Sequence, residues 1–260
     1  GDVLSIHQIP GWNDIGASVT LQGEVAHPGT YGIHEGERLS AVLERAGGLR
    51  PSAYMYGSIL ERTQVRQLEA GTRAQLISNV QSEGASLRNV SDPGGAAAVA
   101  QWQTTLKQLQ NTPPAGRLVI HVSNDVKRWK DTPADIELRA GDVLVVPKQP
   151  NFVMISGAVY NPTAITFRSG KSAGWYLNQA GGPTPVANKK GIFVIRANGS
   201  VIGKSGGLFS GSVLSAELRP GDMMVVPEKA LGGTARWRNI LQASQLVSSV
   251  GIAIQVARGF

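Results

Sequence analysis

The sequence predicts an α+β protein built from two copies of one small unit, and two repeated patterns lead to this prediction. The first pattern is GEVAHPGT at 23–30, which returns as GAVYNPTA at 157–164. It is followed by LERAGG at 43–48, which returns as LNQAGG at 177–182. Both matches lie 134 positions apart. Two matches at one offset indicate a duplicated folding unit.

The second repeated pattern closes each unit. LRAGDVLVVP at 138–147 returns as LRPGDMMVVP at 218–227, at an offset of 80. The first unit therefore carries 54 additional residues before its Gly-Asp strand. A third Gly-Asp strand at 1–6 is expected to be the end of a preceding module. The expected divisions of the chain are this stub and a linker at 1–18, a first unit at 19–148, a second unit at 151–228 and a terminal helix at 234–260.

Local rules predict the same first elements in both units. Apolar, β-branched runs at 19–25 and 152–159 predict strands. His27-Pro28-Gly29-Thr30 predicts a type II turn with Gly29 at positive φ, and a return strand follows.

A helix and a hairpin follow in each unit. Apolar residues at 39, 42, 43 and 46 fall on one helical face, and the copy repeats this pattern over 173–180. Gly47 and Gly181 are expected to end these helices in the left-handed conformation. Asn198-Gly199 between two apolar runs predicts a β-hairpin. The resulting order of strand, strand, helix, strand, strand is typical of a β-grasp module.

The additional residues of the first unit are expected to form a helical hairpin over about 67–112. Its two segments are rich in Ala, Gln, Leu and Arg and are separated by Asp92-Pro93-Gly94. Asp and Pro at this point are typical of a helix N-cap and first helical position.

The expected terminal helix has an unusual distribution of charge. Arg236 and Arg238 stand at one end and Arg258 at the other, and residues 239–257 carry no charge. At ~1.5 Å per residue this uncharged span is ~28 Å long, close to the ~30 Å hydrocarbon core of a bilayer.

This helix is amphipathic, with apolar side chains gathered on one side and Gln and Ser on the other. A lone helix of this kind would leave polar groups without partners in hydrocarbon, whereas a ring of copies would let those faces line water. The alternative is a helix that docks on its own domain. The residues expected in a membrane or pore helix are Trp237, Ile240, Leu241, Val247, Val250, Ile254 and Phe260.

The motifs together resemble a known family. GEVAHPGTY at 23–31, AGG at 46–48 and RAGD at 139–142 are similar to the soluble-ligand-binding β-grasp (SLBB) domain. Two such domains followed by an amphipathic helix resemble the outer-membrane polysaccharide export (Wza-type) proteins. The family's N-terminal export domain and lipid-anchored Cys are not in this sequence, and the 54-residue insertion is not part of the simplest family pattern.

The resemblance implies a non-enzymatic component of capsular polysaccharide or exopolysaccharide export in the periplasm and outer membrane of a Gram-negative bacterium. It implies polysaccharide as cargo, self-assembly into an oligomeric ring or channel, contact with outer-membrane lipid, and an inner-membrane polysaccharide co-polymerase as partner. The alternative is a soluble periplasmic glycan- or ligand-binding adaptor whose last helix docks on protein and forms no pore.

The residues show no arrangement typical of an enzyme, a cofactor site or a metal site. The four His are dispersed, the chain has no Cys, and no phosphate-binding loop is present. The repeated Asp142 and Asp222 favour hydrogen bonds within turns over acid–base chemistry. The formal net charge of +7 is scattered without a long basic run, so nucleic acid is not an expected partner.

Aromatic side chains near turns and helix starts are candidates for stacking against sugar rings. The candidate glycan contacts are Tyr31, Trp129 and Trp175. Trp175 and Tyr176 share the helix of the second unit, so one of the two is expected in the core.

Overall fold

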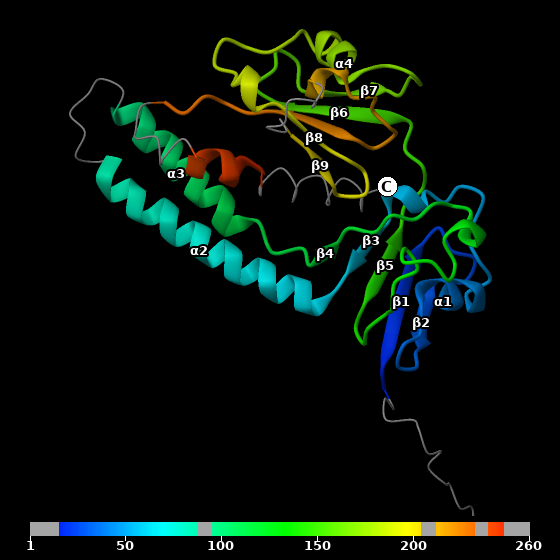
Figure 1. Cartoon of the computed structure of the whole chain (residues 1–260). Helices are drawn as coiled ribbons and strands as arrows, with labels where there is room; N and C mark the ends of the chain where they lie inside the picture. Colours follow the sequence, from blue (N-terminus) through cyan, green and yellow to red (C-terminus); the bar gives the residue numbers. More distant parts are fainter. Residues whose placement is uncertain (1–15, 88–94, 204–211, 232–238, 247–260) are drawn as a thin grey trace, which may run out of the picture.

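The chain forms two five-stranded mixed sheets, each crossed by one short helix (Figure 1). The computed structural model describes residues 16–87, 95–203, 212–231 and 239–246. The first sheet has the order β2-β1-β5-β3-β4 and the second has the equivalent order β7-β6-β10-β8-β9. The predicted α+β fold of two tandem β-grasp modules is confirmed.

The elements recur in the same sequence in both modules. The first module contains β1 (Ser18–Gly23), β2 (Gly29–Gly32), α1 (Leu39–Arg45), the 3-10 turn η1 (Met55–Gly57), β3 (Ile59–Glu61), β4 (Arg117–Leu118), the 3-10 turn η2 (Val126–Arg128) and β5 (Val143–Val146). The second contains β6 (Phe152–Gly157), β7 (Thr163–Thr166), α4 (Ala173–Gln179), η3 (Lys189–Gly191), β8 (Phe193–Ile195), β9 (Val201–Ile202), η4 (Val213–Ser215) and β10 (Met223–Val226).

The first and last strands of each module pair in parallel at the centre of the sheet. Thr20 pairs with Val143 in the first module, and Met154 pairs with Met223 in the second. The other pairings are antiparallel. Each sheet is therefore completed only when the last strand enters between two strands formed much earlier in the chain.

A glycine ends the first strand of each module. Gly23 has a φ of 82° and Gly157 a φ of 92°. A Cβ at these positions would lie 2.1 Å from the carbonyl oxygen of Val146 and 2.2 Å from that of Val226, respectively. Only glycine allows this close approach, so each strand ends two residues earlier than predicted. The predicted positive φ of Gly29 is wrong, because Gly29 already pairs with Leu21 in β2 and is extended.

The predicted helical faces form the two module cores. The four predicted apolar residues of the first helix are completely buried, and Gly47 and Gly181 take positive φ after α1 and α4 as expected. Tyr176 is the core member of the Trp175–Tyr176 pair. The Tyr176 hydroxyl donates to the carbonyl of Arg168 at 3.0 Å and accepts from its N–H at 2.8 Å.

A buried ion pair recurs in both modules. Arg62, directly after β3, binds Asp142 at 2.7 Å, and Arg196, directly after β8, binds Asp222 at 2.7 Å. The two aspartates are 1% and 0% exposed. Each carboxylate also accepts the N–H of the arginine three residues before it, at 2.9 and 2.8 Å. The repeated Gly-Asp motif therefore supplies both a turn and a buried counter-charge for an arginine.

Burial raises the pKa of the Asp222 carboxyl above its usual range. Hydrogen bonds from Arg219 and Ala197 and the Arg196 guanidinium act in the opposite direction and reduce this shift. The paired arginines also donate to backbone, Arg62 to Glu137 O at 2.9 Å and Arg196 to Glu217 O at 2.7 Å. The pair thus ties together three segments of each module.

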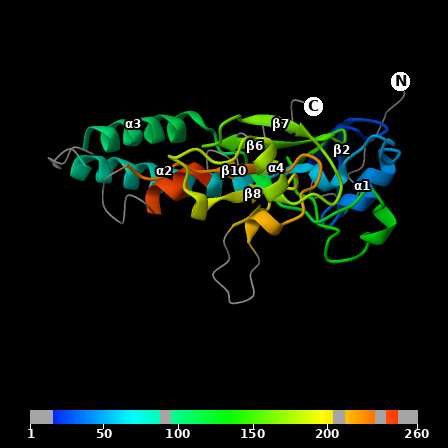
Figure 2. The same cartoon turned by 90° about the horizontal axis from the view of Figure 1, so that it is seen from above.

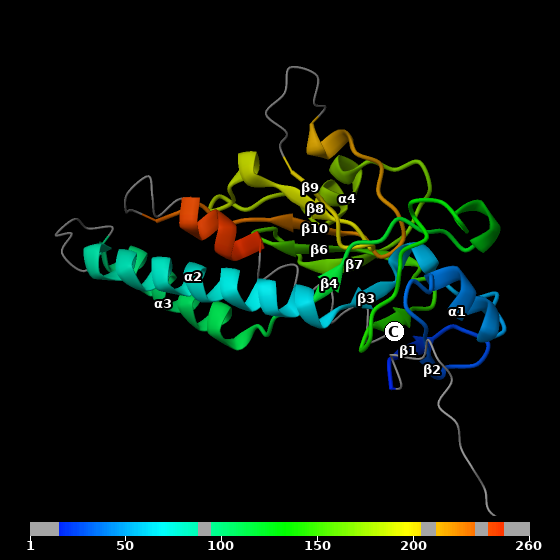
Figure 3. The same ribbon diagram turned by 60° about the horizontal axis from the view of Figure 1, so that its bottom comes forward.

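The insertion of the first module is a helical hairpin, as predicted. It consists of α2 (Thr63–Leu87) and α3 (Gly95–Asn111) and lies between β3 and β4. The Trp102 ring of α3 packs directly on Gly84 of α2, where a Cβ would lie only 2.1 Å from the ring. The Trp102 Nε1–H donates to Val80 O at 2.6 Å. Figures 1 and 3 show this hairpin running beneath the second sheet. In Figure 2, α1 and the far ends of α2 and α3 lie at opposite ends of the molecule.

Within the described residues, contacts of Tyr54, Tyr56 and Arg117 join the first module to the second. Tyr54 donates its hydroxyl to Pro220 O at 2.9 Å, and the Arg219 guanidinium lies 4.6 Å from the ring centroid of Tyr56. Arg117, in β4, donates to Ala197 O at 2.6 Å. Burial lowers the pKa of Arg117 to about 10.

We predict that Asp222→Ala lowers the free energy of unfolding by about 3 kcal/mol, because Arg196 would then be largely buried without its counter-charge. Urea denaturation measures this change. Asp125→Ala is the matched control, since its pair with Arg128 is exposed on both sides and 3.9 Å long, and a change within about 0.5 kcal/mol is expected there. Equal losses in the two variants would contradict a structural role for the buried pair.

Candidate functional site

The central strand of the second sheet, β10, is buried on both faces, and this distinguishes it from the equivalent strand of the first sheet. Every residue of β10 is buried, whereas β5 alternates between buried and half-buried residues. On the face away from α4, apolar side chains form their own cluster with Leu246 of the C-terminal segment packed against it. The buried members of this cluster are Phe193, Ile195, Met223 and Val225. The hairpin and the C-terminal segment lie on this side of the sheet (Figures 1 and 3).

The described part of the C-terminal segment, 239–246, is helical and docks between the hairpin and the second sheet. Leu241 is 2% exposed and packs in one cluster with Val80, Trp102 and Leu109 of the hairpin. Ser244 is also buried, and its hydroxyl donates to the carbonyl four residues earlier at 2.8 Å. The segment therefore bridges two layers of the structure.

Gln101 of α3 fixes the chain just before this helix. Its side-chain amide donates to Lys229 O at 3.0 Å and accepts from the N–H of Leu231 at 3.0 Å. Both hydrogen bonds connect the insertion of the first module to residues that follow the second module.

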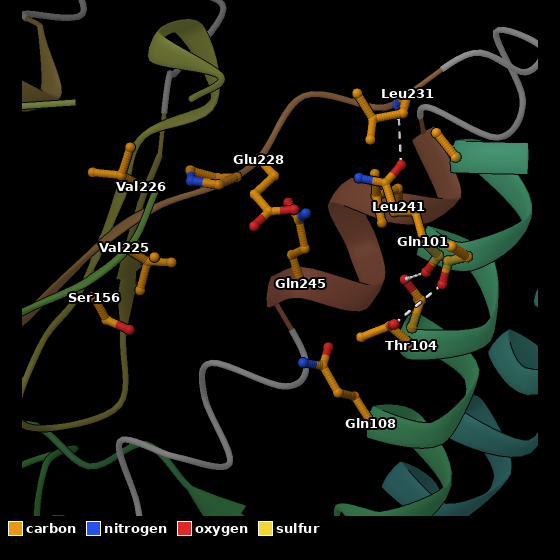
Figure 4. A pocket seen from close by; sticks show the side chains of 15 residues that line it. Gln101, Thr104, Gln108, Ser156, Val225, Val226, Glu228, Leu231, Leu241 and Gln245 are labelled. Atoms are coloured by element: carbon orange, nitrogen blue, oxygen red, sulfur yellow. Dashed lines mark hydrogen bonds between the residues drawn. The ribbon is translucent and has the colours of Figure 1, made fainter. Parts of the chain in front are cut away.

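A cleft of about 510 Å³ remains between α3, the ends of β6 and β10, and the docked helix (Figure 4). Its α3 wall carries Gln101, Thr104 and Gln108, and the side chains of Glu228 and Gln245 point toward each other across its middle. The Oε1 atom of Gln245 is buried and accepts no hydrogen bond within the described residues. Amides, hydroxyls and one carboxylate can donate to and accept from a ligand rich in hydroxyl groups.

The expected membrane or pore helix falls only partly within the described residues. Ile240 and Leu241 are described, and both pack against the hairpin. The other five lie outside the described residues: Trp237, Val247, Val250, Ile254 and Phe260. Among the helices that the structure describes, none is long and apolar enough to cross a bilayer.

The three candidate glycan contacts lie in different environments. Trp129 is 4% exposed and donates its Nε1–H to Ser123 O at 2.9 Å, so its ring belongs to the core and offers no surface for a sugar. Tyr31 is half-buried and its hydroxyl donates to His27 O at 2.5 Å. Trp175 is half-buried on α4 with two cationic side chains over its ring.

The two aspartates of the repeated Gly-Asp motif have structural roles. Asp142 and Asp222 are the buried counter-charges of the two modules. Over the described ranges no three His, Asp or Glu side chains gather as a metal site.

The comparisons with known proteins agree with this architecture. Residues 18–74 and 152–205 match the family model of the SLBB domain, so each of the two modules carries a match to this domain. It is related to the outer-membrane polysaccharide export proteins, as the sequence predicted. The two relatives described below are named for polysaccharide transport and export, and neither name is that of an enzyme.

Two relatives illustrate the similarity. The chain is 25% identical over 222 residues to the polysialic acid transport protein KpsD of Escherichia coli, covering 81% of this chain and 36% of the relative. It is 29% identical over 135 residues to the EPS I polysaccharide export outer membrane protein EpsA of Ralstonia solanacearum, covering 46% of this chain and 35% of that protein. The chain therefore spans about a third of the length of each relative.

Sequence reasoning missed the cleft and the residues that anchor the C-terminal segment. Gln101, Leu246 and Gln245 carry no local motif. One signal was available, because the exposed positions of α3 carry mainly glutamine, threonine and alanine, with Lys107 as the single charged residue of this helix. Such a weakly charged helix face is suited to cover by protein.

We predict that Leu241→Asp releases the docked segment, because a carboxylate would replace a leucine in the hairpin cluster. The loss of about 3 kcal/mol of burial corresponds to about a hundredfold faster amide exchange over 239–246. Hydrogen–deuterium exchange measures this rate. Ala243→Asp is the control, since residue 243 is exposed and the same charge there should leave the exchange unchanged. Unchanged protection in the Leu241 variant would show that this docking is not stable in solution.

Proposed function

We propose that this protein is a non-enzymatic component of capsular polysaccharide or exopolysaccharide export across the periplasm and outer membrane of a Gram-negative bacterium. The observation that carries this proposal is the tandem of SLBB domains in a chain that resembles a polysialic acid transport protein over 81% of its length. The fold supports it, because both modules have well-packed cores whose titratable motif residues are engaged in structural ion pairs.

The finer form of the proposal is an oligomeric ring whose C-terminal helices, 234–260, contact or span the outer membrane. Its support is the uncharged stretch at 239–257, bounded by arginines, and the polar and apolar faces of that helix. In this form an inner-membrane polysaccharide co-polymerase delivers the polymer to the ring. In this form, residues 239–246 are docked on the hairpin in a single chain, and they leave this position when the ring assembles.

The second candidate is a periplasmic glycan-binding adaptor whose last helix docks on protein and forms no pore. The burial of Leu241 against the first module's insertion favours it. Size separates the two candidates. The ring requires a large assembly when the full chain is extracted in detergent, whereas the adaptor allows a monomer in buffer without detergent.

We predict that removal of residues 234–260 releases the protein from outer membranes while both modules stay folded. Membrane fractionation measures the first effect and thermal unfolding the second. A truncated protein that still partitions fully into the outer membrane would contradict the membrane role of this segment.

A matched pair of substitutions tests the amphipathic character of the helix. Ile254→Asp places a charge on the apolar side and should reduce membrane association at least about tenfold, because a carboxylate in hydrocarbon costs about 2.5 kcal/mol or more. Gln242→Asp places the same charge on the polar side and should have little effect. Equal behaviour of the two variants would count against a lipid-facing side.

A further inference from the structure

The two modules have equivalent but separate cores, and they differ on the outer faces of α1 and α4. By the 134-residue offset, Trp175 of α4 occupies the position of Ala41, and Tyr160 occupies the position of Ala26. The second module therefore carries two aromatic side chains at surface positions where the first carries methyl groups. Packing of the shared fold does not require them, because the first module is built without them.

Trp175 is held in a defined orientation. Its ring meets the Tyr176 ring edge-on, with 4.9 Å between centroids and 90° between planes. Tyr176 is itself fixed by the two hydrogen bonds of its hydroxyl to the backbone of Arg168. An aromatic surface that is ordered in advance loses little entropy when a ligand binds.

Two cationic side chains lie over this ring. The Arg168 guanidinium carbon lies 5.7 Å from the Trp175 centroid, and the Lys171 ammonium nitrogen lies 5.8 Å from it. Both distances are within the range of cation–π attraction. Neither cationic group forms an ion pair with a carboxylate of the described chain. The equivalent residues of the first module are His34 and Glu37, so that module lacks the positive charge.

The charge of the two modules differs in the same sense. Residues 151–228 contain seven Lys and Arg against three Asp and Glu, a net charge of +4. Residues 19–148 contain fourteen against thirteen, a net charge of +1. The surface around α4 is therefore part of the module that attracts anions.

Tyr160 extends this surface to the other end of α4. It is 66% exposed, and its N–H donates to Gly182 O at 3.1 Å, directly after the helix. The seven residues of α4 span about 10 Å. Figure 1 shows α4 on the side of the second sheet opposite the hairpin, so the docked C-terminal segment does not cover this face.

We propose that the outer face of α4 is a binding site for an acidic polysaccharide. The carboxylates of the polymer draw the exposed Arg168 and Lys171 side chains aside, a sugar ring takes their place against Trp175, and the following part of the polymer extends toward Tyr160. This assignment rests on the proposed export function and adds to it the chemical class of the polymer and the module that contacts it. Charge complementarity selects an acidic polymer, and the aromatic surfaces select one with sugar rings over a simple polyanion.

The test uses the purified full chain and a hyaluronan decasaccharide, with the carboxyl-reduced form of the same oligosaccharide as the neutral comparison. Calorimetry should show binding of the acidic form that weakens with rising salt and about tenfold weaker binding of the reduced form. Equal binding of both forms would overturn the assignment to acidic polymers. A single-stranded DNA that binds more tightly than the oligosaccharide would also overturn it.

A matched pair of double variants tests the location. Arg168→Gln with Lys171→Gln should weaken binding about tenfold, since it removes both cations beside the ring. Lys189→Gln with Lys190→Gln removes the same charge from exposed positions of the same module and should change affinity less than about twofold. Equal losses in both would show a diffuse charge effect and no site. Tyr160→Ala, at an exposed position, should weaken binding without changing thermal stability, and unchanged affinity would remove Tyr160 from the site.

A cellular measurement separates failure of this site from failure of the export function. If loss of the whole protein leaves surface polysaccharide unchanged, the export proposal is wrong, whatever the binding data show. If loss of the protein abolishes surface polysaccharide while the Arg168 and Lys171 double variant restores it fully, the export function stands and the α4 site is overturned. We expect cells with the Arg168 and Lys171 double variant to carry less surface polysaccharide than cells with the unchanged protein. Cells with the Lys189 and Lys190 control variant should carry the normal amount.

Discussion

The buried arginine–aspartate pair is the contact on which each module depends. The last strand must enter between two strands formed long before it, and the pair fixes both the turn that leads into that strand and the end of its neighbour. A buried carboxylate without its guanidinium is strongly unfavourable, so neither partner can change alone. In the first module α2 begins at Thr63, directly after Arg62. The ion pair is therefore also the base from which the helical hairpin leaves the sheet.

The hairpin changes the surroundings of the second module more than those of the first. It runs beneath the second sheet, and a sheet covered on both faces needs apolar residues throughout its central strand, as β10 has. The C-terminal segment enters the same layer through Leu241 and Leu246. As a result, one face of the second sheet holds the hairpin of the first module and the C-terminal segment against the second module. The opposite face, which carries α4, is covered neither by the hairpin nor by residues 239–246, and it carries the features that distinguish this module from its duplicate.

Much of the fold could be predicted because duplication doubles the signal of every local rule. The core faces of α1 and α4, the glycines after them and the helical nature of the insertion are all set by residues close in sequence. The sequence also held an unused signal, since Arg62 and Arg196 are 134 positions apart. The burial of Trp129, the cleft and the docking of 239–246 depend on contacts between distant segments, which no local pattern encodes. The role of the remaining residues of the terminal helix stays a prediction.

Both modules have a connection between their third and fourth strands, but only the connection of the first module carries an insertion. In the first copy the link between its third and fourth strands became the helical hairpin. In the second copy the corresponding Asn-Gly turn is pressed against Arg117, where a Cβ at Gly199 would lie 2.8 Å from the guanidinium, and Ala197 accepts a hydrogen bond from it. Additional residues in that turn would disrupt this contact between the two modules. The first module therefore has room for an insertion at this loop, whereas the same loop of the second module is part of the contact between the modules.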